Sequence, residues 1–178
     1  MPLTIETTPS AEQTARNLSR WKEILADKEL AGLPHKIETD RHGHILMSPP
    51  PAPKHGKKQF RIGSLLEKHL PQGIILTECP ISTADGVKST DVAWLAPERA
   101  QEADSDTALT TAPEICVEVL SPSNTTSAIE EKRALYFGAG AKEVWICQQN
   151  GKLEFYCQDL PDTPARSLLC PDFPNLIN

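Results

Sequence analysis

Long apolar runs are missing from the sequence. No run approaches the roughly 18 residues that a membrane-spanning helix requires. Residues 1–10 also lack the basic region followed by an apolar stretch that marks a signal peptide. We therefore expect a cytoplasmic protein with no membrane partner.

Closely spaced cysteines are missing too. The chain has five cysteines, an odd number, and no CxxC pair, so neither a disulfide framework nor a thiolate zinc site is favoured. Reduced, buried thiols in a cytoplasmic protein explain the pattern better. The five are Cys79, Cys116, Cys147, Cys157 and Cys170.

An excess of positive charge is also absent, because the formal net charge is -6. The chain as a whole therefore has no attraction for nucleic acid or anionic membranes. One local basic cluster stands at the start of a predicted helix and comprises Lys54, His55, Lys57, Lys58 and Arg61. It is either a contact surface for a phosphate backbone or an ordinary solvated helix face.

The length of 178 residues and the hydrophobic content of 39% suit one domain covering residues 1–178. Hydrophobic periodicity, caps and turn residues predict an α/β fold of the α+β kind, with a mixed sheet, flanking helices and an N-terminal hairpin. Residues 1–9 are expected to form a loose leader and residues 158–178 an irregular C-terminal strap. Helices are expected near residues 10–30, 57–70 and 126–137, the hairpin at 36–48, and strands near 74–79, 88–95, 115–120, 142–148 and 152–157.

Some local features of these elements are predicted in more detail. The dipeptide Asn150-Gly151 indicates a type I′ turn. In the hairpin, Ile37 is expected to point inward and Glu38 toward water. In the second helix, Phe60 is expected on the packed face, together with Leu66 and Leu70.

Residues 113–136 are the most informative stretch of the chain. The segment 115–120 is apolar except at Glu118, which is typical of a strand buried on both faces, where a carboxylate needs a partner. In the helix that follows, Ile129, Lys132 and Tyr136 share one face. The Lys132 ammonium therefore points toward Glu118, as a structural ion pair or as part of a site, unless its head reaches back to water.

A second carboxylate, Asp91, stands in a strand 27 residues before Glu118. Two carboxylates that converge in a cleft attract a hard cation, and Mg²⁺ suits one or two carboxylates plus waters and a substrate phosphate. A nearby lysine can hold an attacking water or stabilise the charge that develops on a phosphate. Asp91, Glu118 and Lys132 around Mg²⁺ would therefore make a phosphodiesterase site.

Several segments resemble the Uma-type family of restriction endonucleases, within the PD-(D/E)xK nuclease superfamily. Residues 89–93 (STDVA) are similar to its PDV strand, and residues 118–123 carry its EVLSPS strand end. The segment from Lys132 and Tyr136 to residues 140–146 (GAKEVWI) matches its K...Y..aGv.eyWi pattern. The first hairpin and the next helix also fit, through Glu38, Gly43, residues 47–49 and His55.

The resemblance covers about residues 30–157 and implies a restriction-endonuclease-like core in which Asp91 and Glu118 hold a divalent metal. In the superfamily's usual motif the lysine lies two residues after the glutamate, a position that is Leu120 here, and the family resemblance moves this role to Lys132. Two departures stand out: Thr90 where the family often has proline, and Ala128 where many members have aspartate.

The favoured interpretation is a Mg²⁺-dependent endonuclease, with Mn²⁺ as an alternative ion, that hydrolyses DNA. Asp91 and Glu118 would bind the metal and Lys132 would orient or activate the water. Glu38 would add a ligand, and His55 would contact the scissile phosphate or support the fold. One alternative is a nuclease-fold protein that binds nucleic acid without useful catalysis, and another is an interaction protein whose site is only an ion-pair network. A homodimer would suit cutting of both strands, which needs two sites.

Overall fold

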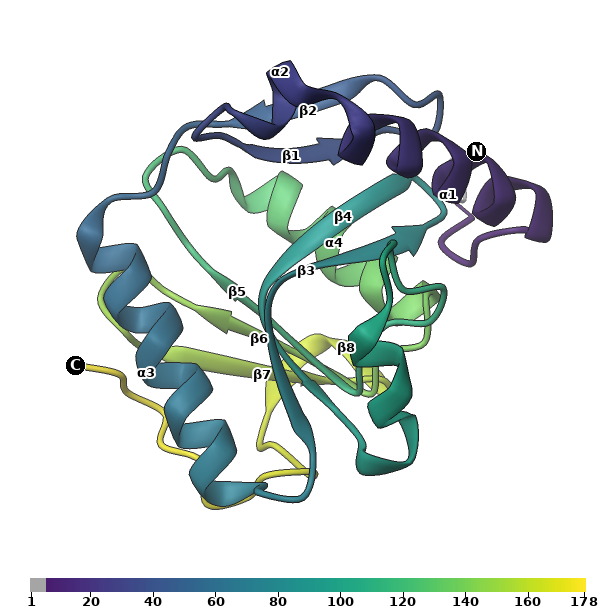
Figure 1. Ribbon diagram of the computed structural model, residues 1–178. Helices are drawn as coiled ribbons and strands as arrows, with labels where there is room; N and C mark the ends of the chain where they lie inside the picture. Colours follow the sequence, from purple (N-terminus) through teal and green to yellow (C-terminus); the bar gives the residue numbers. More distant parts are fainter. Residues whose placement is uncertain (1–5) are drawn as a thin grey trace.

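A six-stranded mixed sheet lies at the centre of the protein (Figure 1). The structure is a computed structural model, and it describes residues 6–178, so part of the predicted leader lies outside the described residues. The strand order is β3-β4-β5-β6-β7-β8, in which β5 and β6 are parallel and the other neighbours antiparallel. The predicted mixed sheet is thus confirmed. The strands are β3 (Ile74–Thr83), β4 (Gly86–Leu95), β5 (Ile115–Val119), β6 (Glu143–Cys147), β7 (Leu153–Cys157) and β8 (Leu160–Ala165).

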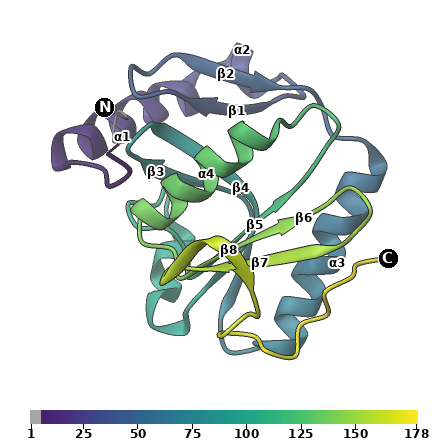
Figure 2. The same ribbon diagram turned by 180° about the vertical axis from the view of Figure 1, so that it is seen from behind.

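The helices cover both faces of this sheet (Figures 1 and 2). Helix α3 (Pro53–His69) lies on one face, and α4 (Thr126–Gly138) lies on the other. A small hairpin sheet, β1 (Lys36–Thr39) and β2 (Ile45–Ser48), lies over the end of β4 with α1 (Ala11–Ala26) and α2 (Lys28–Ala31). A 3₁₀ helix, η1 (Pro97–Asp104), follows β4. Within residues 6–178, no helix has both the length and the apolar character needed to cross a membrane.

The core is divided by the sheet into two clusters. On one face Ile62 and Leu66 of α3 pack against Val92 and Val117, together with the C-terminal strap. On the other face Ile129 and Tyr136 of α4 pack against alternate residues of the same strands. Every residue of β4, β5 and β6 is buried, as the apolar runs of the sequence predict for strands covered on both faces.

Several element boundaries differ from the prediction for local reasons. The first helix breaks at Asp27, whose carboxylate accepts hydrogen bonds from Glu29 N and Leu30 N and so caps a separate α2. Strand β3 continues through Pro80, which an outer strand tolerates. Helix α3 begins at Pro53, because proline fits the first helical position. Thr125, and not Thr126 or Ser127, caps α4.

Three further predictions were wrong. Phe60 is 76% exposed and not on the packed face of α3. The turn at Asn150-Gly151 is not type I′, because within residues 6–178 Glu78 is the one non-glycine residue with positive φ, whereas type I′ requires positive φ at both central residues. The strap is irregular only in part, since residues 160–165 form β8, whose exposed side chains lie at the edge of the sheet.

The strap is anchored by the buried carboxylate of Glu143 in β6. Its Oε1 accepts hydrogen bonds from Leu168 N at 2.7 Å and Leu169 N at 2.8 Å. Its Oε2 accepts from Trp145 Nε1 and Ser167 Oγ, both at 2.7 Å. Four donors therefore converge on one buried carboxylate, which ties residues far apart in the sequence to the sheet.

We expect Glu143→Gln to lower the free energy of unfolding by about 2–3 kcal/mol, because an amide would turn its own N–H groups toward two of these donors. Urea unfolding followed by circular dichroism would measure the change. The control is Glu131→Gln at an exposed position of α4, which should change stability by less than about 0.5 kcal/mol. Equal effects of the two substitutions would contradict this account of the anchor.

Candidate active site

The candidate site lies where β4 and β5 separate. Their pairing runs from Trp94 with Ile115 to Val92 with Val117. Beyond that pair, side chains replace the ladder: Thr90 Oγ1 donates to Val117 O at 2.9 Å, and Asp91 Oδ2 accepts from Val119 N at 2.7 Å. This fork between β4 and β5 brings the carboxylates of Asp91 and Glu118 to one edge of the sheet.

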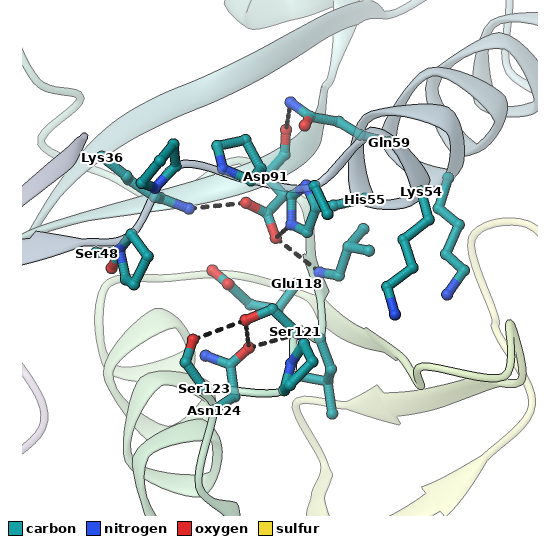
Figure 3. A pocket seen from close by; sticks show the side chains of 18 of the residues that line it. Lys36, Ser48, Lys54, His55, Gln59, Asp91, Glu118, Ser121, Ser123 and Asn124 are labelled. Carbon is teal, nitrogen blue, oxygen red and sulfur yellow. Dashed lines mark hydrogen bonds and ion pairs between the residues drawn. The ribbon is translucent and has the colours of Figure 1, made fainter. Parts of the chain in front are cut away.

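A pocket of about 700 Å³ opens at the fork (Figure 3). The side chains of Asp91 and Glu118 line it and are only 4% and 5% exposed. One wall is the start of α3 with His55, and the rim is the proline-rich linker 48–52. The loop 121–124 after β5 forms another wall, where Asn124 Oδ1 accepts from Ser121 N and stabilises the turn. Five separate segments thus converge on two buried carboxylates.

Asp91 is surrounded by donors and positive charge. Lys36 Nζ lies 2.8 Å from Oδ1, and His55 Nε2 lies 3.4 Å from Oδ2. Burial alone would raise the pKa of Asp91, but the His55 contact, the Lys36 ammonium and the Val119 N–H outweigh it and hold the pKa well below its usual value. The hydrogen bond to Asp91 in turn raises the pKa of His55.

Glu118 is held from α4. Tyr136 donates its hydroxyl to Oε1 at 2.6 Å, and Lys132 Nζ lies 3.4 Å from the same oxygen. Burial raises the pKa of Glu118, although Lys132 opposes the shift. The inward face of α4 predicted from residue spacing is therefore present, and Lys132 points into the site.

Glu38 does not face water as the hairpin pattern indicated. Lys132 Nζ lies 2.7 Å from its Oε1, closer than to Glu118, and Ser89 N donates to the same oxygen at 2.8 Å. The prediction failed because the hairpin docks on β4, where Val87 N donates to Thr39 Oγ1. Burial raises the pKa of Glu38, but Lys132 and Lys36 together lower it below its ordinary value.

Lys36 and Glu78 are site residues that the sequence did not identify. Lys36 Nζ lies 3.8 Å from Glu78 Oε2 in addition to its contact with Asp91. Glu78 has a φ of 50 in the middle of β3, which is uncommon for a residue with a side chain and typical of functional sites. Gln59 Nε2 bridges Glu78 Oε1 and the Asp91 carbonyl. No spacing or motif marks these residues, because their placement depends on how the hairpin and α3 dock.

The charges of the site leave room for a divalent cation. Four carboxyl groups, of Glu38, Glu78, Asp91 and Glu118, lie near two ammonium groups, of Lys36 and Lys132, so the acidic side chains outnumber the lysines by two. Within residues 6–178, no three His, Cys, Asp or Glu side chains form a metal-binding cluster, so a cage made only of side chains is not offered. Two carboxylates that leave positions for water and phosphate fit the preference of Mg²⁺, and Asp91 and Glu118 could hold it.

Comparisons with known proteins give a family and a similar fold. The family model Uma2, described as "Putative restriction endonuclease", matches residues 27–176, which is more than half of the chain. The chain is also similar to the crystal structure of "a putative nuclease belonging to DUF820" from Anabaena variabilis, with 18% identity and a TM-score of 0.57 over 71% of this chain and 73% of that one. At this identity the similarity shows the fold. Among curated proteins no sequence matches.

We expect Asp91→Asn to lower the free energy of unfolding at pH 7 by about 3 kcal/mol, because the buried Lys36 ammonium loses its partner. The lowered pKa of folded Asp91 stabilises the protein above the ordinary aspartate pKa of about 4, and this contribution is lost as the pH falls below it. The difference between wild type and variant should therefore shrink from pH 6 to pH 3 in urea unfolding experiments. Asp159→Asn, at an exposed position, is the control, and a constant difference for Asp91→Asn would contradict the assignment.

Proposed function

The chain belongs to the Uma2 family, and on this premise we propose that it is a Mg²⁺-dependent endonuclease that hydrolyses DNA phosphodiester bonds. The family and the nuclease-like fold support a nuclease function in general terms. The observation that carries the finer proposal is the meeting of Asp91, Glu118 and Lys132 from β4, β5 and α4 in one pocket. Each of these elements is fixed by the core, so the three groups are held on rigid supports.

Asp91 and Glu118 are the proposed metal ligands. Asp91 Oδ2 is already committed to Val119 N, so Oδ1, which contacts the Lys36 ammonium at 2.8 Å in this structure, is the oxygen proposed to bind the cation. On Glu118, Oε1 accepts from Tyr136, and Oε2 has only a long contact of 3.5 Å with Lys132. When bound, Mg²⁺ or Mn²⁺ would polarise a phosphoryl oxygen and lower the pKa of water. Tyr136 and Val119 N keep the two carboxylates oriented toward the pocket.

Lys132 is the proposed catalytic lysine. Its ammonium group lies 2.7 Å from Glu38 and 3.4 Å from Glu118, so it is held next to the proposed metal ligands. Burial lowers the pKa of Lys132, but Glu118 and Glu38 raise it by more, so the group stays cationic at neutral pH. A cationic lysine there orients an attacking water and stabilises the negative charge that develops on the phosphate. Glu38 acts through Lys132 as a positioning residue.

His55 is proposed to lie close to the scissile phosphate of a bound substrate. Its Nε2 contacts Asp91, and its Nδ1 is buried with no hydrogen-bond partner among the described residues. The contact with Asp91 also restrains a ligand of the metal, so His55 orients Asp91 whether or not it reaches the scissile phosphate. If both strands of a duplex are cut, two sites are required, and a symmetric homodimer would supply them.

A second candidate function is a nuclease-fold protein that binds nucleic acid without cleaving it. The observation that favours it is that lysines of the chain already pair with two of the acids in the site. Lys36 pairs with Asp91 at 2.8 Å and Lys132 pairs with Glu38 at 2.7 Å, so these two carboxylates have a cationic partner without any metal. The two functions differ in whether the chain binds a divalent ion.

We expect the wild type to nick supercoiled plasmid in Mg²⁺ or Mn²⁺. Glu118→Gln and Lys132→Ala should be at least about 100-fold slower, because the first loses the negative charge that holds the metal and the second loses the positive charge that stabilises the transition state. Gel electrophoresis gives the rates, and circular dichroism confirms that the variants are folded. Glu131→Gln, exposed on the same helix as Lys132, is the matched control and should remain active.

Loss of cleavage in Glu118→Gln but not in Lys132→Ala would support the metal site and show that the role of Lys132 is structural. If the wild type neither cleaves nor binds metal, the proposed catalytic function is wrong, which leaves a protein that only binds nucleic acid or an interaction protein. If it binds metal but leaves this plasmid intact, DNA of this kind is not the substrate.

We expect Lys36→Met to bind Mn²⁺ about 5- to 150-fold more tightly than the wild type, the usual range of coupling between competing ligands. The reason is that the Lys36 ammonium occupies the Asp91 oxygen proposed for the metal. Isothermal titration calorimetry measures the affinity, and Lys54→Met serves as control, because this exposed lysine lines the same pocket but forms no ion pair within residues 6–178. Unchanged or weaker binding by Lys36→Met would show that the metal and Lys36 do not compete.

A further inference from the structure

The first half of α3 carries a basic face that no acid neutralises. Lys54, Lys57, Lys58 and Arg61 follow helical spacing and so share one side of the helix. No Asp or Glu occurs in residues 53–66, and within residues 6–178 none of the four cations forms an ion pair with an acid. Among the residues that the structure describes, Lys58 alone of the four has a hydrogen-bond partner, the carbonyl of Gln149. In a chain with a net charge of -6, this face is a local exception that favours an anionic partner.

The basic face of α3 runs directly into the candidate active site. Lys54 and Lys58 line the pocket that contains Asp91 and Glu118, and Figure 3 shows Lys54 beside His55 at its mouth. Lys57 and Arg61 continue the same face away from the pocket. Side chains from Lys54 to Arg61 span about 10 Å of helix, since each residue advances the axis by about 1.5 Å.

Phe60 adds an aromatic ring to the outer surface of α3. It is 76% exposed, whereas Ile62 and Leu66 of the same helix are fully buried. Phe60 lies one turn after Lys57 and directly before Arg61, so a base that follows the phosphates would meet its ring. An exposed aromatic ring beside cations that follow a backbone is the usual arrangement for binding unpaired bases.

The burial of the two carboxylates limits how a nucleic acid can reach them. The side chains of Asp91 and Glu118 are 4% and 5% exposed, so the backbone must enter the pocket to reach them. A single unpaired strand is thinner and more flexible than a duplex, so it can follow its backbone into such a pocket.

We propose that the basic face of α3 and Phe60 bind single-stranded DNA and lead it into the pocket. Lys54, Lys57 and Arg61 contact successive phosphates, and Phe60 stacks on an unpaired base. This inference rests on the proposed function, because the strand is led toward the proposed catalytic groups. It adds that the DNA which the site accepts is single-stranded.

The test measures binding with cleavage prevented. Fluorescence anisotropy compares a labelled 20-nucleotide single strand with the corresponding duplex, in EDTA and in Ca²⁺, over a series of KCl concentrations. We expect the wild type to bind the single strand at least tenfold more tightly. Lys57→Gln combined with Arg61→Gln should reduce the slope of log affinity against log salt by about 1.4, since each phosphate contact on a single strand contributes about 0.7.

Two comparisons isolate the contributions of charge and of the aromatic ring. Lys22→Gln combined with Lys28→Gln removes two exposed cations elsewhere and should leave the salt slope unchanged. Phe60→Ala should weaken single-strand binding about 5- to 150-fold, the range for loss of one stacked base, with Phe60→Leu nearly as weak. Leu168→Ala removes an exposed apolar side chain on the strap and should have no effect.

The inference is overturned if the duplex binds as tightly as the single strand, if Phe60→Ala binds normally, or if neither nucleic acid binds. These results are independent of catalysis. A protein that cuts plasmid but shows no preference for the single strand would keep the proposed function and lose this inference. A protein that binds the single strand through Phe60 but never cuts would keep this inference and lose the proposed function.

Discussion

The fork between β4 and β5 is the constraint on which the site depends. A sheet cannot open in its interior without leaving backbone groups unpaired, and here side chains take the place of the missing ladder bonds. Thr90 Oγ1 satisfies Val117 O, and Asp91 Oδ2 satisfies Val119 N. The opening is therefore stabilised by one of the proposed metal ligands, so Asp91 has a structural role in addition to the proposed chemical one.

Burial of several carboxylates at the fork determines how the outer elements are attached. Glu38, Asp91 and Glu118 are stable there only with cations, and the sheet itself supplies none close to them. Lys36 comes from the hairpin and Lys132 from α4, so these two elements are tied to the sheet through the site. The hairpin contributes both an acid and a cation, which explains why its short strands are held firmly against β4 and are not a loose appendage.

The parts of the fold and site that follow from local pattern could be predicted from the sequence, and those that follow from docking could not. Asp91 and Glu118 stand out because strands buried on both faces rarely contain acids, and Lys132 because it interrupts an apolar helix face. Lys36, by contrast, is one lysine in a short exposed-looking strand, and its role arises only when the hairpin lies on β4. Phe60 was misplaced because an apolar residue in an amphipathic helix is normally packed.

Lys132 places an ammonium group beside Glu118 from α4, and not from the strand that carries the glutamate. The position two residues after Glu118, where the superfamily that the sequence resembles has its lysine, is Leu120, which packs against the core cluster on the α4 side of the sheet. Lys132 on α4 reaches the Glu118 carboxylate from the helix and also contacts the carboxylate of Glu38. Two carboxylates then restrict a flexible side chain that a single contact would leave mobile, because each hydrogen bond limits its rotamers. Because the lysine lies on α4 and contacts Glu38, the proposed catalytic arrangement includes Glu38 and hence the hairpin.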